Sequence, residues 1–397
     1  MSLNHRPLIK VKKFLILTIL APFIVLLSSA VRINVPEVWY TQNLALLFLF
    51  FVAIILVIWD FNKSLAVFIG LCLFSTCFIT QWSARAVMLL LHLSLAALTS
   101  YGISRIDVRK YKFILKGVLI LVVIQTIFLL LQSWNIDPIF KSLIRQGMKE
   151  TVAFSGSKGQ MGTFFALTAP VLAYFHPALL IITLIGIVFS KSSFAFMATF
   201  VSILTYFFFT NKKLFVRLFL AILIIATVFF NKIDRLTNAD FGMRFDVWKH
   251  AVKSIVTGQI TLQNQDRQII IKTNPIWGYG FGNFLRLFPY VPEGKFNFSN
   301  EKFTHAHNDY IETFVFELGY SGIIALLFLF RSFIWDFIKT EKSKELMLYF
   351  CCIVAYLLNA MGNFLSHIAV SGILLTIFYG MYKGTRRELN GKVAVSC

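Results

Sequence analysis

Most of this chain consists of apolar runs as long as a membrane-spanning helix. Such a helix needs about 20 mostly apolar residues. With 58% hydrophobic and 14% charged residues, the chain has roughly half the charge of a soluble protein. A soluble multidomain enzyme and a disordered chain are therefore excluded, because too little polar surface remains and aromatic residues are abundant. We predict an all-α polytopic membrane protein with twelve spans, at 14–31, 43–59, 64–80, 86–101, 113–132, 161–175, 177–190, 192–210, 214–230, 308–330, 346–362 and 368–382.

Lysine and arginine gather in every second connection between these spans. Loops that stay in the cytoplasm collect positive charge, so the net charge of +20 is mainly a matter of topology and does not indicate nucleic acid. We expect both termini to be cytoplasmic, together with the connections that carry most of the basic residues. These connections lie at Lys63, 105–116, 212–217, 331–344 and 383–392.

The predicted spans divide the chain into three parts. Residues 1–230 form a membrane region of nine helices, residues 231–307 a long outer loop, and residues 308–397 a membrane region of three helices with a cytoplasmic tail. A loop of this length is usually functional or disordered, and its aromatic residues favour a folded loop on the membrane surface. Within it, the spacing of Phe245, Trp248 and Val252 is typical of an amphipathic interfacial helix.

The densest group of polar side chains lies where the outer loop re-enters the membrane. Ionisable residues at such a boundary usually face the interior of a helix bundle, and a histidine there can act as a general base. Two readings compete with this one: loop histidines without a chemical role, and a metal site. The group consists of His305, His307, Asn308, Asp309 and Glu312.

Further polar residues are predicted on the same side. Lys191, within Ser190–Ser193, either binds a lipid phosphate or marks a tight outer turn and reaches water. Arg244 and Trp248 lie one helical turn apart. The segment 274–284 has three glycines at alternate positions, which permit a close approach of the backbone.

In this order the segments resemble the O-antigen ligase and polymerase family of membrane glycosyltransferases. Ser190-Lys191 stands where the family has Ser-Arg, and Arg244 with Trp248 matches its Arg–Trp pair. Asn274 to Gly280 matches its Pro-Leu-x-Gly-x-Gly stretch, His307-Asn308 its His-Asn, and Gly319 to Gly322 its Gly-x-x-Gly. Phe154-Ser155-Gly156 through Gly162 and Pro170 also look like the family. There are two departures. Lys191 replaces an arginine, and ten residues separate Asn308 from Gly319, one more than in the family.

The resemblance implies transfer of a glycan from undecaprenyl diphosphate to an acceptor hydroxyl, such as that of lipid A–core, at the periplasmic face of the bacterial inner membrane. It implies no cofactor and no metal. The implied partners are the lipid-linked donor, the acceptor and membrane lipids, and nucleic acid is not among them. His307 is the expected base, with Asn308 and His305 as further catalytic residues. The diphosphate is expected to bind cations: Arg244, Lys191 and Arg85. The supporting residues are Asp309, Glu312, Trp248, Gly319 and Gly322.

Two other functions stay open at this point. A polymerase of the same family would join lipid-linked repeat units, whereas the ligase moves a complete polysaccharide. A twelve-helix transporter or lipid-oligosaccharide flippase fits the number of spans equally well. The transporter is disfavoured because its site would lie near the membrane midplane, whereas the polar groups here cluster at the outer boundary.

Overall fold

A computed structural model describes residues 50–80, 84–134, 136, 158–264, 267–288, 305–362 and 369–396. The predicted span 14–31, the start of span 43–59 and the segment Phe154–Gly156 lie outside the described residues. The described chain is mostly helical, which confirms the all-α prediction. Its helices are α3 (Lys63–Phe78), α4 (Ala84–Ser104), η2 (Val108–Lys110), α5 (Tyr111–Ser133), α7 (Lys158–Phe175), η3 (Pro177–Leu179), α8 (Leu180–Ser190), α9 (Ser193–Thr210), α10 (Lys212–Thr257), α11 (Phe284–Leu287), η5 (Tyr310–Glu317), α12 (Gly319–Lys339), α13 (Lys344–Asn359) and α14 (Ala369–Ser396).

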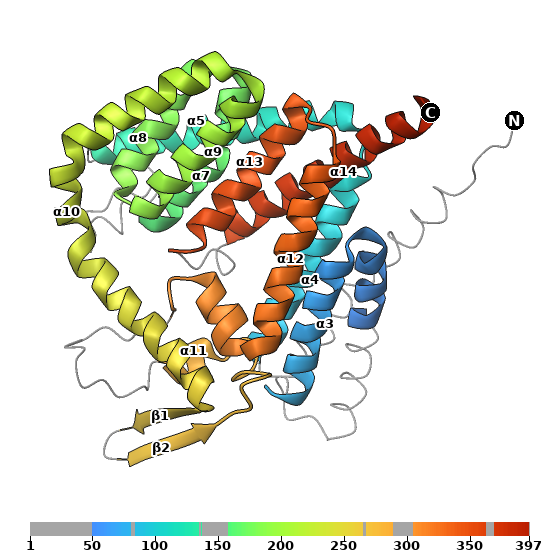
Figure 1. Ribbon diagram of the computed structural model, residues 1–397, viewed down its shortest axis with the longest axis vertical. Coiled ribbons are helices and arrows are strands. Elements are labelled where there is room, and N and C mark those ends of the chain that lie inside the picture. The colour runs from blue at the N-terminus through green and yellow to red at the C-terminus, as the bar shows by residue number, and fades with distance from the viewer. Residues whose placement is uncertain are drawn as a thin grey trace, which may run out of the picture.

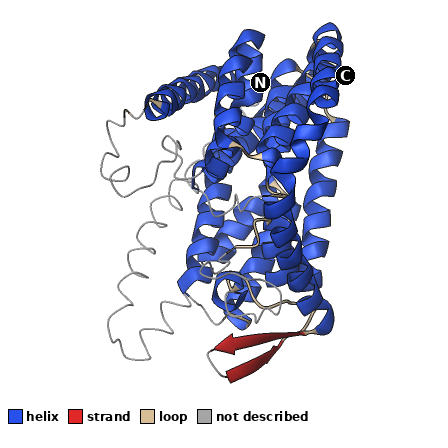
Figure 2. Cartoon of the chain, turned by 90° about the vertical axis from the view of Figure 1, so that its left-hand side faces the viewer, coloured by secondary structure: helices blue, strands red, loops and turns tan. Residues whose placement is uncertain are grey.

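Among the described residues, four helical segments are long and apolar enough to cross a membrane: Arg85–Ser104, Val108–Ser133, Ser193–Thr210 and Gly319–Lys339. Shorter apolar helices occupy Phe50–Phe61, Lys63–Phe78 and Pro177–Ser190. The protein is therefore suited to a membrane, while the count of twelve spans stays a prediction. Figure 2 shows most helices running along the long axis of the molecule, with a β-hairpin at one end.

Polar caps set the breaks between consecutive apolar helices. The side chain of Asn62 accepts a hydrogen bond from Leu65 N at 3.1 Å at the start of α3. Ser192, Asn211 and Ser343 do the same for α9, α10 and α13. Each cap satisfies a backbone N–H that has no partner within its own helix. These short side chains therefore end one helix and start the next without a long loop.

Helix α13 lies at the centre of the molecule. It packs against α7, α9 and α14, and its side chains belong to the largest buried cluster together with those of α5 and α7. A second cluster joins the helix Phe50–Phe61, α3, α4 and α12. A third lies at the hairpin end and joins α10, β1 and η5.

Helix α10 differs from the prediction. It runs without a break from Lys212 to Thr257, so the predicted span 214–230 and the first part of the predicted outer loop form one helix. In Figure 1 it passes along the upper left and then down to the hairpin. The predicted amphipathic segment is helical, with Val247, Ala251 and Ile255 buried and Phe245 exposed.

A two-stranded antiparallel hairpin follows α10 and is the exception to the helical fold. Strands β1 (Gln259–Asn264) and β2 (Arg267–Lys272) pair with Gln259 opposite Lys272. Gly258 ends α10 with a φ of 66° and starts the hairpin. Figure 1 places the hairpin at the lower end, whereas the connections α9–α10 and α12–α13 lie at the upper end. Which end faces the cytoplasm stays a prediction.

Candidate functional site

The carboxylate of Glu312 organises the segment where the chain returns to the helix bundle. Glu312 is fully buried and lies in the first turn of the π-helix η5. Its Oε2 accepts a hydrogen bond from Ala306 N at 2.9 Å, and its Oε1 lies 3.0 Å from Nδ1 of His305. Both carboxylate oxygens are thus used to hold the loop that carries the two histidines.

This contact orients the His305 ring and selects its tautomer. An ionised carboxylate only accepts hydrogen bonds, so Nδ1 of His305 donates to Glu312. In the neutral ring the basic lone pair then lies on Nε2. A histidine whose orientation and tautomer are fixed by a buried carboxylate is the arrangement that general-base catalysis requires. The side chain of His305 remains 17% exposed, so this ring can meet a substrate.

His307 and Asn308 have different structural roles. His307 has a φ of 51°, which is uncommon for a residue with a side chain and typical of functional turns. The side chain of Asn308 accepts hydrogen bonds from Tyr310 N at 3.0 Å and Ile311 N at 3.1 Å. Asn308 therefore caps the start of η5. Asp309, also buried, donates its backbone N–H to Ala360 O at 3.1 Å.

Two side chains from successive turns of α10 contact the histidine loop and the end of α13. Nε1 of Trp248 donates to Ala306 O at 2.8 Å, and Nη1 of Arg244 donates to Gly362 O at 2.8 Å. They lie four residues apart, and residues at that spacing share one face of a helix. The Arg–Trp pair that the sequence singled out thus joins α10 to the histidine loop and to the end of α13.

The polar elements meet where α13 ends. Just after the helix, Ala360 O accepts a hydrogen bond from Asp309 N and Gly362 O accepts one from Arg244. In the last turn of the helix itself, Leu357 O accepts one from the hydroxyl of Tyr310 at 2.7 Å; carbonyl groups of a last turn lack partners within the helix and carry partial negative charge. A side chain on Gly362 would overlap the ring of Phe194, so this turn also lies against the start of α9.

Phe194 connects the site to the Ser190–Ser193 turn. Lys191 ends α8 in the left-handed conformation, with a φ of 52°, and its side chain is exposed. Ser190 is buried; its Oγ accepts a hydrogen bond from Ser192 N at 3.3 Å. The turn reaches the site through Phe194 and Gly362, which places Lys191 near the end of α13.

The glycine-rich loop and the Gly-x-x-Gly segment interlock. Tyr279 N donates to Phe316 O at 3.0 Å and Gly280 N to Glu317 O at 2.8 Å, while Tyr320 N and Ser321 N donate to carbonyls of 275 and 276. A Cβ on Gly278 would lie 2.6 Å from Gly319 N, and Gly319 itself has a φ of 61°. Gly322 packs just as closely on Phe314 O. These glycines therefore serve backbone contact and not substrate contact.

The segment between Asn308 and Gly319 contains a π-helical turn. Leu318 N bonds to Thr313 O, five residues earlier, at 3.1 Å. A turn with that spacing contains one residue more than an α-helical turn, and such turns are frequent at functional sites. The π-helix ends just before Gly319, which has a positive φ and starts α12.

Arg85 lies on α4, next to the glycine-rich loop at the hairpin end of the bundle. It is the second residue of α4, and its buried Nε has no hydrogen-bond partner among the residues that the structure describes. The next residue, Ala86, is packed against Gly282, and Phe281 N donates to Ser75 Oγ at 2.8 Å. These contacts place Arg85 beside the glycine-rich loop. Lys191 and Arg244 are instead connected to the end of α13.

Among the described residues, the candidate metal ligands do not come together as a set. Across the described ranges, no three histidine, cysteine or carboxylate side chains come together. Glu312 faces His305, while the backbone of Asp309 faces α13. Of His305, His307, Asp309 and Glu312, the candidate metal ligands, these contacts bring together His305 and Glu312.

The structure adds two kinds of group that are not among the predicted site residues: the carboxylate of Glu317 and the carbonyl groups at the end of α13. Glu317 is 1% exposed, and its Oε1 accepts a hydrogen bond from Phe284 N at 3.1 Å; a carboxylate inside an apolar run is a sequence signal for such a role. The carbonyl groups at the end of α13 have no signal in the sequence, because every residue has one. No family model matches the chain, and no curated protein matches it. Function is therefore inferred from the site.

Proposed function

We propose that this protein is a membrane glycosyltransferase of the O-antigen ligase type, which moves a glycan from undecaprenyl diphosphate to an acceptor hydroxyl such as that of lipid A–core. The observation that carries the proposal is the buried Glu312 carboxylate on Nδ1 of His305. Proton transfer from a hydroxyl needs a base of fixed orientation and tautomer. The order of the sequence motifs supports the choice of family.

In the proposed step, a histidine removes the proton of the acceptor hydroxyl. The acceptor oxygen bonds to the anomeric carbon while the bond from that carbon to the diphosphate breaks, and the diphosphate leaves with the electron pair. His305 is the better-supported base, because Glu312 orients it. His307, two residues later in a strained turn, is the second candidate and the one that the family resemblance favours.

The leaving diphosphate needs positive charge. Lys191 is exposed in a turn that packs next to the end of α13, and Arg244 is bound to that end. Arg85 approaches from α4 and has a buried, unpartnered Nε among the described residues. We propose Lys191 and Arg244 as the first pair of cations and Arg85 as a third group, for the glycan or the acceptor.

The proposal includes a topology. The chain would cross the bacterial inner membrane twelve times, with both termini in the cytoplasm and the hairpin end at the periplasmic face. Four helices of suitable length and apolarity support insertion. Cysteine substitution at Lys272 in the hairpin and at Lys342 between α12 and α13, followed by labelling with an impermeant reagent, tests the orientation. We expect labelling at Lys272 alone in intact cells.

The decisive test is the analysis of surface glycans and lipid-linked intermediates in a deletion strain. Loss of a ligase leaves full-length polymer on the carrier without attachment to lipid A–core. Accumulation of short lipid-linked repeats instead indicates the polymerase. Absence of periplasmic intermediates, with glycan retained on the cytoplasmic side, indicates a flippase and contradicts the proposal.

The two histidines are separated by paired variants. His305→Ala and His307→Ala are each expressed in the deletion strain, and membrane insertion is checked by protein recovery from the membrane fraction. If His305 is the base, its variant loses transfer by about 10²-fold or more, while the His307 variant keeps a measurable rate. The reverse result assigns the base to His307, and full activity in both contradicts a histidine base.

A further inference from the structure

A basic cavity opens at the end of the bundle opposite the hairpin. It measures about 280 Å³ and is lined by Asp60, Phe61, Ser104, Arg105, Lys383, Arg386, Arg387 and Asn390. These residues come from the end of the helix Phe50–Phe61, the end of α4 and the second half of α14. The volume is at the lower limit for small-molecule sites, which suits a compact polar group.

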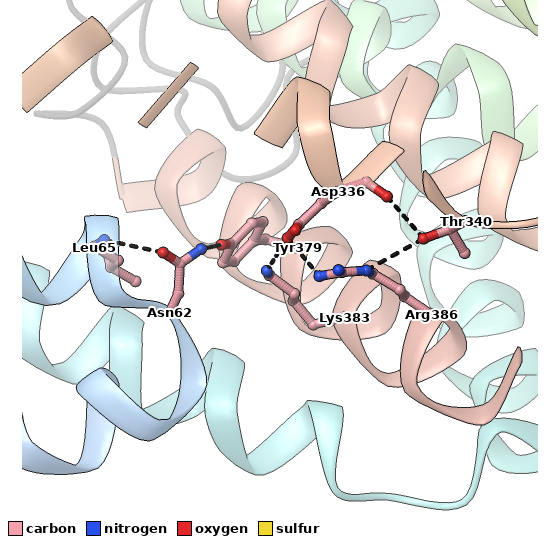
Figure 3. A network of polar contacts seen from close by, with 7 residues as sticks. All are labelled: Asn62, Leu65, Asp336, Thr340, Tyr379, Lys383 and Arg386. Carbon is pink, nitrogen blue, oxygen red and sulfur yellow. Dashed lines mark hydrogen bonds and ion pairs between the residues drawn. The ribbon is translucent and has the colours of Figure 1, made fainter. Parts of the chain in front are cut away.

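The positive charge of this basic cavity is only partly balanced. Figure 3 shows Lys383 and Arg386 turned toward the same carboxylate, that of Asp336 on α12. The distance from Arg386 Nη1 to Asp336 Oδ2 is 2.6 Å, and Nε of Arg386 donates to Thr340 Oγ1 at 3.2 Å. One carboxylate thus serves two cations and fixes both of them in the wall of the cavity.

Arg105 and Arg387 have no such compensation. Within the described part of the chain neither forms an ion pair with a carboxylate, and Arg105 lies over the ring of Tyr101 at 5.0 Å. Burial lowers the pKa of Arg387, and the charge of Arg105 lowers it further. Glu388, the next residue of α14, is exposed and does not line the cavity. Two guanidinium groups with solvent-exposed side chains therefore line the same cavity, and their like charges repel each other.

Close packing of α14 against α4 brings together the chain segments that carry these two arginines. Gly380 and Gly384 lie four residues apart on α14, a spacing that lets helices approach closely in membranes. A Cβ on Gly380 would lie 2.7 Å from Ser100 O, and one on Gly384 would lie 3.0 Å from Ser104 O. The backbones of α14 and α4 thus nearly touch just before Arg105 and Arg387, so the two arginines extend from one tightly packed part of the helix pair.

We propose that the basic cavity binds a phosphate group, with Arg105 and Arg387 as its direct ligands and with Lys383 and Arg386 as fixed cations behind them. Guanidinium groups match two phosphate oxygens at once, and an anion would relieve the repulsion between them. Trp59 and Ile106 are adjacent to lining residues and are exposed apolar side chains, which favours the headgroup of an anionic phospholipid over a free phosphate. Basic pockets between membrane helices bind such headgroups.

Binding is measured on the purified full chain in a zwitterionic detergent without phosphate. Short-chain phosphatidylglycerol and inorganic phosphate are titrated separately, and thermal unfolding is followed by tryptophan fluorescence. A ligand of the folded state raises the unfolding temperature in a saturable way. We expect saturation with phosphatidylglycerol, and saturation with inorganic phosphate only at concentrations at least tenfold higher. Equal affinity for both assigns the site to a free phosphate compound.

The variant that tests the ligands is Arg105→Gln with Arg387→Gln, which should raise the Kd for phosphatidylglycerol at least tenfold. The matched control is Arg109→Gln with Lys112→Gln, because both residues are exposed at the same end and do not line the cavity. Equal weakening in the control, or no saturable binding by the unaltered protein, overturns the proposal. If the double variant does not fold, Arg387→Lys replaces it; this variant keeps the charge and loses the paired contact, so a smaller loss of affinity is expected.

Discussion

Replacement of Glu312 by glutamine tests the proposed base most directly. The carboxylate accepts from two donors, Ala306 N at 2.9 Å and Nδ1 of His305 at 3.0 Å. A glutamine amide has one acceptor oxygen and one donor nitrogen. If its oxygen stays on Ala306, the amide N–H meets His305 and forces the other ring tautomer. If its oxygen turns to His305, the amide N–H faces a buried backbone N–H.

The magnitude follows from these two arrangements. A buried donor without an acceptor costs about 1–3 kcal/mol of stability. A base in the wrong tautomer loses its contribution to the rate, about 10²–10⁴-fold. We therefore expect Glu312→Gln to insert and fold with moderately reduced thermal stability and to lose glycan transfer by about 10²-fold or more. Transfer is measured as the rate at which lipid-linked glycan reaches the acceptor in membranes of the complemented strain.

Glu317→Gln is the matched control. Glu317 is equally buried, lies on the same π-helix and also accepts from a backbone N–H, that of Phe284, so its variant should lose similar stability and keep the rate. The double variant Glu312→Gln with His305→Ala should be no slower than His305→Ala alone, because residues that act as a unit are not additive. A Glu312→Gln variant with a near-normal rate of transfer refutes the reasoning.

Three further predictions concern the surrounding structure. Gly319→Ala should destabilise the protein strongly, since its φ of 61° and its contact with Pro275 O exclude a side chain, whereas Gly372→Ala, with open space around it, should be neutral in thermal unfolding. Lys191→Gly should raise stability by about 1–2 kcal/mol through relief of the left-handed conformation and reduce transfer, while Lys191→Arg keeps transfer; a fully active glycine variant excludes a role for the charge. Burial raises the pKa of Tyr279 to about 12, so its stabilisation is complete below pH 10 and is lost as the pH rises through about 12; Tyr279→Phe should flatten this part of the stability profile.

The sequence predicts the helices well and the continuous α10 poorly, for a physical reason. Apolar runs set the positions of the helices, and polar caps such as Ser192 and Ser343 set their boundaries. Between Lys212 and Thr257 the sequence has no proline and a single glycine, Gly242, so nothing breaks the helix where its hydrophobicity ends. Hydropathy reports where a helix leaves an apolar environment and carries no information on where the helix itself stops.

The hairpin and the assembly of the site were less accessible to sequence reasoning. Strand β2 carries consecutive isoleucines at 269–271 and so lacks the alternation that marks a half-buried strand. The sequence groups Glu312 with the two histidines because they lie close together along the chain, and the structure pairs it with His305. The meeting of Arg244 and Asp309 at the end of α13 was not foreseeable, because backbone carbonyls accept both hydrogen bonds.

The hydrogen bond between Asn62 and Tyr379 can form only late in the synthesis of the chain. Nδ2 of Asn62 donates to the hydroxyl of Tyr379 at 2.5 Å across 317 residues of chain. At about 5–20 residues per second, a nascent chain carries this amide for tens of seconds before its partner leaves the ribosome. A chain released before α14 lacks this hydrogen bond, so the contact that ties the start of α3 to α14 forms only once the last helix has been made.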